Sequence, residues 1–127
     1  MAFERGPGDG KPGVFVAAAA LAQPGWEQAL ADRDAPHLVF DWRREAAPDA
    51  LAGEATLLAA EVAGTVETAL CPHGGGPPIC WCRPPLPGLL LAYARARGVD
   101  PARSLLLGTS PAHRTLATTL GARYLPV

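Results

Sequence analysis

Short apolar runs alternate along this chain with segments that have helical spacing, and this alternation limits the folds that the chain can adopt. An apolar run bounded by turn formers is typical of a buried strand. Strands are expected over residues 14–16, 37–40, 104–107 and 123–125. Helices are expected over residues 26–33, 48–68, 89–97 and 111–120. Because strands that are joined through helices pair in parallel, the sequence predicts an α/β fold, a three-layer Rossmann-like parallel sheet flanked by helices.

The chain has 127 residues, a length that suits one domain. Residues 1–13 are rich in glycine and proline and show no periodicity, so we expect a flexible leader ahead of a single domain at residues 14–127. The leader does not form a phosphate-binding loop. Gly10-Lys11 is followed by Pro12, where that motif requires serine or threonine.

Charge and hydropathy argue against two classes of partner. The formal net charge of -1 gives no electrostatic reason to expect nucleic acid. The longest apolar run, residues 14–22, is shorter than the roughly 20 residues of a membrane span. We therefore expect a cytoplasmic protein that binds neither nucleic acid nor membrane. The abundance of alanine, glycine, proline and arginine is typical of a GC-rich bacterial genome.

The three cysteines and one of the three histidines of the chain lie close together, in residues 71–82. Cys71 and His73 form one pair, Cys80 and Cys82 form another, and a Gly/Pro-rich loop separates the pairs. Three thiolates and one imidazole complete a tetrahedral Zn²⁺ site that leaves no position for water, which is the arrangement of a structural zinc. Such a site contributes on the order of 10 kcal/mol to folding. The other interpretation is that these are buried thiols beside an incidental histidine.

The zinc loop opens a longer motif. The motif reads Cys71-Pro72-His73, then Cys80-Trp81-Cys82-Arg83, then Pro85-Leu86-Pro87-Gly88, and the chain continues later with Leu107-Gly108-Thr109-Ser110. This pattern resembles the haloacid dehalogenase (HAD) superfamily. Within it, the pattern is similar to the zinc-containing heptose bisphosphate phosphatase and histidinol phosphatase branch. The resemblance covers residues 71–127 by motif and residues 14–70 by the order of elements only.

The resemblance implies an active site whose acidic residues this chain has lost. Members of the family attack phosphorus with an aspartate at the end of the first strand, form an aspartyl-phosphate, and carry a second aspartate two residues later. These two positions correspond to Ala17 and Ala19. The family's lysine corresponds to Pro84, its magnesium-binding aspartate to Thr109 and a further acid to His113. We therefore expect no catalytic residue and no bound Mg²⁺.

Four polar residues remain as candidates for ligand binding. Arg83 resembles the arginine that contacts substrate phosphate in this branch, although it could equally steady the zinc loop. Thr109 and Ser110 could donate hydroxyl groups at the carboxyl edge of the sheet, where α/β folds bind ligands. Ser110 also suits an N-cap, because Pro111 follows it. Asp41 ends a strand and begins a charged loop, but a lone carboxylate lacks a partner for acid–base chemistry.

The leading hypothesis is a non-catalytic, zinc-containing HAD-like pseudophosphatase that acts as a protein-interaction or regulatory module. Its partner would be another protein or a second copy of the chain, in contact with apolar surface around residues 17–20 and Trp42. The alternative is a phosphatase or hydrolase with altered catalytic residues that acts on a phosphorylated small molecule. A zinc-dependent nucleic-acid binder is a third possibility, against which the net charge counts.

Overall fold

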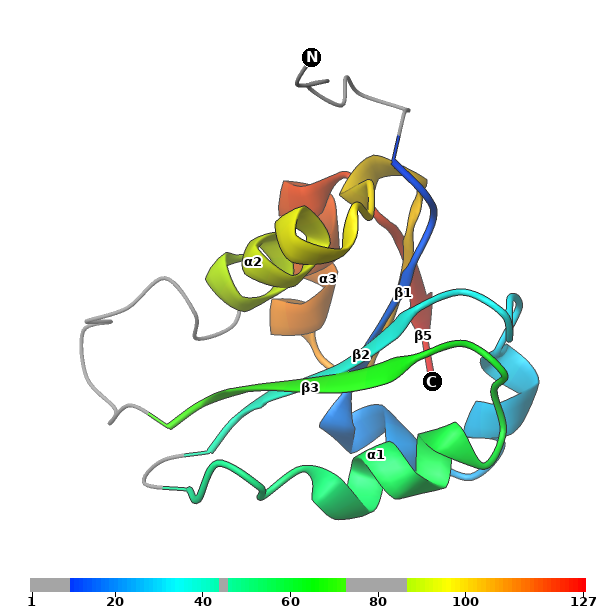
Figure 1. Ribbon diagram of the computed structural model, residues 1–127, viewed down its shortest axis with the longest axis vertical. Coiled ribbons are helices and arrows are strands. Elements are labelled where there is room, and N and C mark those ends of the chain that lie inside the picture. The colour runs from blue at the N-terminus through cyan, green and yellow to red at the C-terminus, as the bar shows by residue number, and fades with distance from the viewer. Residues whose placement is uncertain (1–9, 44–45, 73–86) are drawn as a thin grey trace.

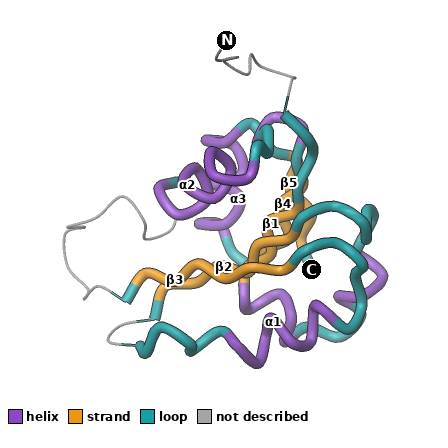
Figure 2. The backbone as a smooth tube through the Cα atoms, viewed as in Figure 1, coloured by secondary structure: helices purple, strands orange, loops and turns teal. Residues whose placement is uncertain are grey.

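A five-stranded, fully parallel sheet forms the centre of the protein, which confirms the predicted parallel sheet and adds one strand to the four expected. The computed structural model describes residues 10–43, 46–72 and 87–127. The strand order is β3-β2-β1-β4-β5 (Figures 1 and 2). The strands are β1 (Val14–Ala17), β2 (His37–Trp42), β3 (Val66–Cys71), β4 (Leu105–Gly108) and β5 (Arg123–Pro126).

Helices cover both faces of the sheet, which gives the expected three layers (Figure 1). One face carries α1 and two short 3-10 helices, and the other carries α2 and α3. The bounds are α1 (Ala52–Ala59), α2 (Gly88–Arg97), α3 (Pro111–Leu120), η1 (Ala18–Ala22), η2 (Trp26–Ala29) and η3 (Pro101–Arg103). The segment expected as a helix at residues 26–33 is therefore only a single 3-10 turn at its start.

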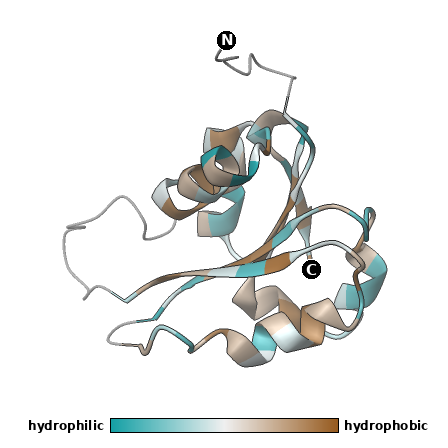
Figure 3. Cartoon of the chain, viewed as in Figure 1, coloured by the Kyte–Doolittle hydropathy of each residue, from teal (hydrophilic) through white to brown (hydrophobic). Residues whose placement is uncertain are grey.

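The core consists of two apolar clusters separated by the sheet. Successive residues of a strand point to opposite faces, so β1 contributes Val14 and Val16 to one cluster and Phe15 and Ala17 to the other. Figure 3 shows apolar residues, in brown, on α1 and α2 as well as in the strands between them. All four residues of β1 are buried, as expected for the central strand of a sheet that is covered on both faces.

The structure corrects the prediction of one long helix over residues 48–68. α1 ends at Ala59, and a fifth strand, β3, begins at Val66. The break between them lies at Gly64, where an added Cβ would overlap the backbone of Asp34 and Ala35. Val66 fits the helical spacing of the preceding segment, but it is the first residue of a strand that pairs with β2 along its whole length.

The ends of α2 and α3 follow the predicted signals. Gly98 and Gly121 come directly after these helices and adopt left-handed backbone conformations, with φ of 67° and 75°. Pro111 occupies the start of α3, and the Ser110 hydroxyl accepts a hydrogen bond of 3.3 Å from the backbone N–H of His113. The interpretation of Ser110 as an N-cap is therefore confirmed.

The described chain starts at Gly10, four residues before the expected domain boundary. The backbone N–H of Lys11 donates to the carbonyl of Gly98 at 3.0 Å, and the N–H of Asp100 donates to the carbonyl of Lys11 at 2.9 Å. The Gly13 N–H donates to the hydroxyl of the buried Ser104 at 3.0 Å. These bonds join residues 10–13 to the segment between α2 and β4. In the described ranges, no helix has the length and apolarity that a membrane crossing requires.

Candidate functional site

The strand order reverses at β1, so that β1 and β4 are neighbours whose carboxyl ends lie at the same edge of the sheet. The chain runs outward from β1 to β2 and β3, then returns to the other side of β1 to form β4 and β5. In open parallel sheets, ligands bind at this point of reversal, outside the carboxyl ends of the strands. The residues that follow Ala17 and Gly108 therefore form the candidate site.

The β1 side of the site consists of alanines. Ala17 is the last residue of β1, pairs with Phe40 of β2 and is 1% exposed. η1 begins immediately after it, and within that turn Ala18 and Ala20 are buried while Ala19 is exposed. A methyl group has neither an oxygen to attack phosphorus nor a lone pair to bind a metal ion. The side chains on this side of the site therefore offer no group that could react with a substrate or bind a metal ion.

The β4 side carries a histidine that folds back over the strand end. The Nδ1 atom of His113 accepts a hydrogen bond of 3.0 Å from the backbone N–H of Thr109. In the neutral ring, the proton consequently sits on Nε2. The ring also packs edge-on against Phe40, with centroids 5.8 Å apart. The close approach of the His113 side chain to the end of β4 requires glycine at position 108, since an added Cβ there would lie 2.5 Å from the Cβ of His113.

Burial favours the neutral form of His113. Desolvation lowers the pKa of this imidazole, and the nearby carboxylate of Asp41 only partly offsets that effect. A neutral His113 can donate one hydrogen bond from Nε2, but its other nitrogen is already occupied by Thr109. In its neutral form, His113 therefore provides one hydrogen-bond donor at this strand end.

The β2 side of the site is closed by a network centred on Arg43. The Arg43 guanidinium donates to Asp41 Oδ2 at 2.8 Å, to the carbonyl of Ala50 at 3.1 Å and to the carboxylate of Glu54 on α1. The other oxygen of Asp41 accepts the backbone N–H of Trp42 at 2.8 Å. Hydrogen bonding to Glu54 raises the pKa of Arg43, and the same bond lowers the pKa of Glu54. Asp41 is therefore part of a structural link between β2 and α1.

The structure brings Asp41, Thr109 and Ser110 to the same edge of the sheet. Thr109 is exposed, so its hydroxyl can reach a ligand. Ser110 is committed to capping α3, and Asp41 to Arg43. Of the predicted ligand-binding residues in the described ranges, Thr109 has the most accessible side chain. Arg83 lies outside the described residues.

Cys71 is the one predicted zinc ligand that the structure describes. It ends β3, lies opposite Trp42 in the register of β2 and β3, and is 0% exposed. Its carbonyl accepts the backbone N–H of Arg43 at 3.0 Å, so the strand end is held in place. His73, Cys80 and Cys82 lie outside the described residues, and within residues 10–43, 46–72 and 87–127 no group of three or more potential ligands forms a metal site.

The exposed apolar surface differs from the prediction. Ala17, Ala18 and Ala20 are buried, which leaves Ala19 as the exposed residue of that segment. A groove of about 390 Å³ lies instead between η1 and α1, and Leu57 on its rim is 53% exposed. No local sequence signal marks this groove or the Arg43–Glu54 link. In both cases, segments that are distant along the chain come together only in the folded state.

Comparisons with known proteins support the fold. No protein-family model matches the sequence, and no curated protein does. A candidate HAD-like phosphatase from Mesorhizobium loti superposes with a TM-score of 0.67 at 22% identity, over 89% of this chain and 70% of that one. The D,D-heptose 1,7-bisphosphate phosphatase from B. bronchiseptica, solved with magnesium and phosphate, superposes with a TM-score of 0.55 at 21% identity. That match covers 88% of this chain and 78% of the phosphatase.

Proposed function

We propose that this protein is a non-catalytic domain with the fold of HAD-like phosphatases, and that it acts as a protein-interaction or regulatory module. The observation that carries the proposal is the buried Ala17 at the carboxyl end of the central strand. A phosphatase of this fold that works through an aspartyl-phosphate needs a carboxylate at that point. The position two residues later, Ala19, lacks one as well.

The other side chains of the candidate site do not replace the missing carboxylates. Mg²⁺ prefers hard, anionic oxygen ligands, and Thr109 offers only a neutral hydroxyl. Burial favours the neutral form of His113, whose Nδ1 accepts a hydrogen bond from a backbone N–H. Asp41 is bound to Arg43. Because none of these three side chains can take the place of the missing carboxylates, they favour the loss of phosphoryl-transfer activity.

A direct assay tests the proposed loss of catalysis. Purified protein is incubated with p-nitrophenyl phosphate and Mg²⁺, and release of p-nitrophenol is measured. We expect a rate no higher than that of a mock-purified control. Turnover that disappears in Asp41→Asn would contradict the proposal, and it would support the alternative of a phosphatase or hydrolase with altered catalytic residues. His113→Gln serves as a second variant, because glutamine keeps a polar side chain but removes the imidazole.

The alternative enzyme has one observation in its favour. Asp41, Thr109 and His113 come from three different segments and meet at the edge where this fold binds ligands. A neutral imidazole beside a carboxylate resembles the pairing of an acid–base site. The phosphate-ester assay separates the two proposals, since the alternative requires turnover that depends on these side chains.

We also propose that Cys71, His73, Cys80 and Cys82 bind one structural Zn²⁺. The donor chemistry supports this, because three thiolates and an imidazole match zinc, and Cys71 anchors the segment at the buried end of β3. Metal analysis should return about one zinc per chain. Cys80→Ser should lower both the zinc content and the melting temperature, whereas His113→Gln should leave the zinc content unchanged. Equal zinc in wild type and Cys80→Ser would count against the site.

For the interaction role, the groove between η1 and α1 is the surface best suited to a partner protein or a second copy. It is lined by Ala18, Leu21 and Ala22 on one side and by Gly53, Glu54 and Leu57 on the other. Leu57→Asp should weaken self-association or partner capture, measured by light scattering and by pull-down from the native host. Leu91→Asp on α2 is the matched control, because Leu91 is also exposed, at 41%, but belongs to the opposite face. Equal effects of the two variants would contradict the assignment of this groove.

A further inference from the structure

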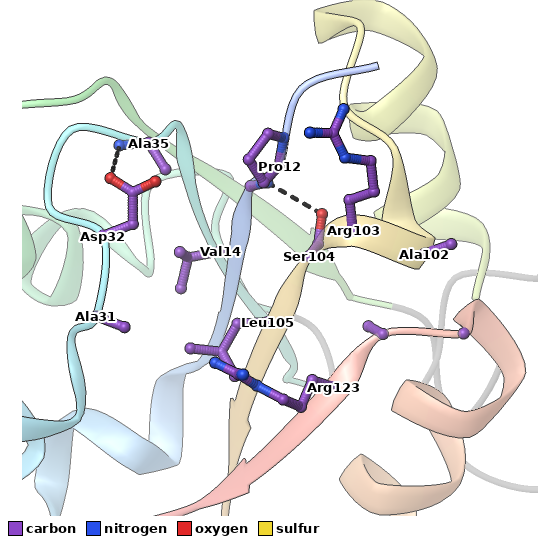
Figure 4. Close-up of a pocket in the computed structure, with 13 residues that line it drawn as sticks. Pro12, Val14, Ala31, Asp32, Ala35, Ala102, Arg103, Ser104, Leu105 and Arg123 are labelled. Atoms are coloured by element: carbon purple, nitrogen blue, oxygen red, sulfur yellow. Dashed lines mark hydrogen bonds between the residues drawn. The ribbon is translucent and has the colours of Figure 1, made fainter. Parts of the chain in front are cut away.

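A second hollow lies at the opposite edge of the sheet from the candidate site. It has a volume of about 440 Å³ and is formed where three strands begin, at Val14, Leu105 and Arg123 (Figure 4). The loop before β2 closes it through Ala31, Asp32 and Ala35. We propose that this pocket, here called the amino-edge pocket, binds a small zwitterion that carries one carboxylate and one ammonium group.

The backbone of the pocket floor is saturated with hydrogen bonds. The N–H of Gly13 donates to the Ser104 hydroxyl, and that hydroxyl donates to the carbonyl of Asp100 at 2.7 Å. The N–H groups of Leu105 and Arg123 donate to the carbonyls of Gly13 and Ser104, at 3.1 and 3.0 Å. A ligand therefore finds few backbone donors there. Its polar recognition has to come from side chains on the walls.

The cationic wall is Arg123. Within the described residues this arginine makes no hydrogen bond or ion pair through its guanidinium, so all five N–H donors are available. In Figure 4 the side chain extends away from β5 and passes beside Leu105. Arg103, the other arginine of the lining, is already committed, because it donates to the carbonyl of Gly10 at 2.6 Å. Arg123 can thus bind a carboxylate in a bidentate manner.

The anionic wall is Asp32, across the pocket from Arg123 (Figure 4). Its Oδ1 atom accepts the backbone N–H groups of Asp34 and Ala35, at 3.1 and 3.2 Å, which fixes the orientation of the carboxylate. The second oxygen, Oδ2, accepts no hydrogen bond and joins no ion pair in the part of the chain that the structure describes. It can therefore accept a hydrogen bond from an ammonium group.

Asp32 and Arg123 do not neutralise one another. In the described residues no ion pair joins them, although both line the same hollow. The lining between them is partly apolar, with Val14, Leu105 and several alanines beside Ser104 and Arg103. Opposite charges on two walls, with these apolar side chains among the residues between them, match a short methylene chain with opposite charges at its ends.

Isothermal titration calorimetry with a series of ω-amino acids tests this proposal on the full chain. The probes are glycine, β-alanine, γ-aminobutyrate, δ-aminovalerate and ε-aminohexanoate, with butyrate and butylamine as probes that carry one charge. We expect one member of the series to bind at least about ten-fold more tightly than either of these, because a charge-assisted hydrogen bond contributes roughly one factor of ten. The best chain length measures the span between the two walls.

Three variants separate specific binding from a general charge effect. Arg123→Gln and Asp32→Asn should each weaken the best ligand about ten-fold, and asparagine keeps an oxygen for the two backbone N–H groups. Arg95→Gln is the matched control, since Arg95 is exposed on α2 and does not line the pocket. Melting temperatures verify that each variant folds.

The proposal is overturned if no member of the series binds, or if butyrate binds as tightly as the best zwitterion. It is also overturned if Asp32→Asn leaves the affinity unchanged, because the pocket would then recognise a carboxylate alone. These outcomes are independent of phosphatase activity and zinc content. The amino-edge pocket lies on the other edge of the sheet from the residues that support the proposed function.

Discussion

Replacing Ala17 by aspartate puts a carboxyl group back at the end of the central strand. Ala17 is 1% exposed and belongs to a cluster of buried apolar residues that includes Phe40 and Leu116. Arg43, the arginine that follows the neighbouring strand β2, already binds Asp41 and Glu54. A carboxylate at position 17 would therefore be buried without a partner, and the protein should become less stable.

The size of this effect follows from the pKa of the new group. An unperturbed aspartate has a pKa of about 3.9, and each unit by which burial raises that pKa corresponds to about 1.4 kcal/mol. A buried carboxyl group takes up a proton instead of remaining charged, so at pH 7 the electrostatic cost is limited to about three such units, or about 4 kcal/mol. Because the pKa is raised in the folded state, the cost is absent below about pH 4 and grows as the pH increases. A cost of this size is a large part of the roughly 5–15 kcal/mol that stabilises a typical domain.

Urea denaturation at pH 4 and pH 7, followed by tryptophan fluorescence, measures the difference. Ala19→Asp is the matched control, because Ala19 is exposed and the same substitution there should change the free energy of unfolding by about 0.5 kcal/mol or less. Equal small effects of the two variants at pH 7 would refute the reasoning about burial. Magnesium-dependent phosphatase activity in Ala17→Asp would refute the claim that the rest of the catalytic machinery is missing.

Three further outcomes are expected. Gly108→Ala should lower the free energy of unfolding by about 1–3 kcal/mol, because the new Cβ would collide with His113; an unchanged denaturation midpoint would contradict this. Arg43→Met should return the pKa of Glu54 toward its ordinary value, as followed by NMR titration, and should cost about 1 kcal/mol at low salt and less at high salt. Burial lowers the pKa values of His37 and His113, so the unfolded state binds more protons below about pH 6.5, and stability should fall with decreasing pH by up to about 1.4 kcal/mol per unit for each histidine. Denaturation curves of equal midpoint from pH 7 to pH 5 would disprove the last expectation.

The sequence alone was enough to predict the fold class and to show that the end of the first strand lacks a carboxylate. The burial pattern of β1 and β4 depends on local apolar runs, and the ends of α2 and α3 depend on Gly98 and Gly121, all of which can be read from neighbouring residues. The absence of a carboxylate at position 17 is a matter of residue identity. Folding cannot add an oxygen that the side chain lacks.

The tertiary structure decided the features that depend on distant partners. The strand from Val66 to Cys71 is stabilised by pairing with β2, and its first residue, Val66, also fits the helical spacing of the segment before it, so the local pattern did not separate the two structures. The contact of Arg43 with Glu54 and the two hollows each need segments that the chain brings together from far apart. The spacing of apolar residues indicates which face of a helix or strand is buried, whereas long-range packing determines which other elements lie against that face.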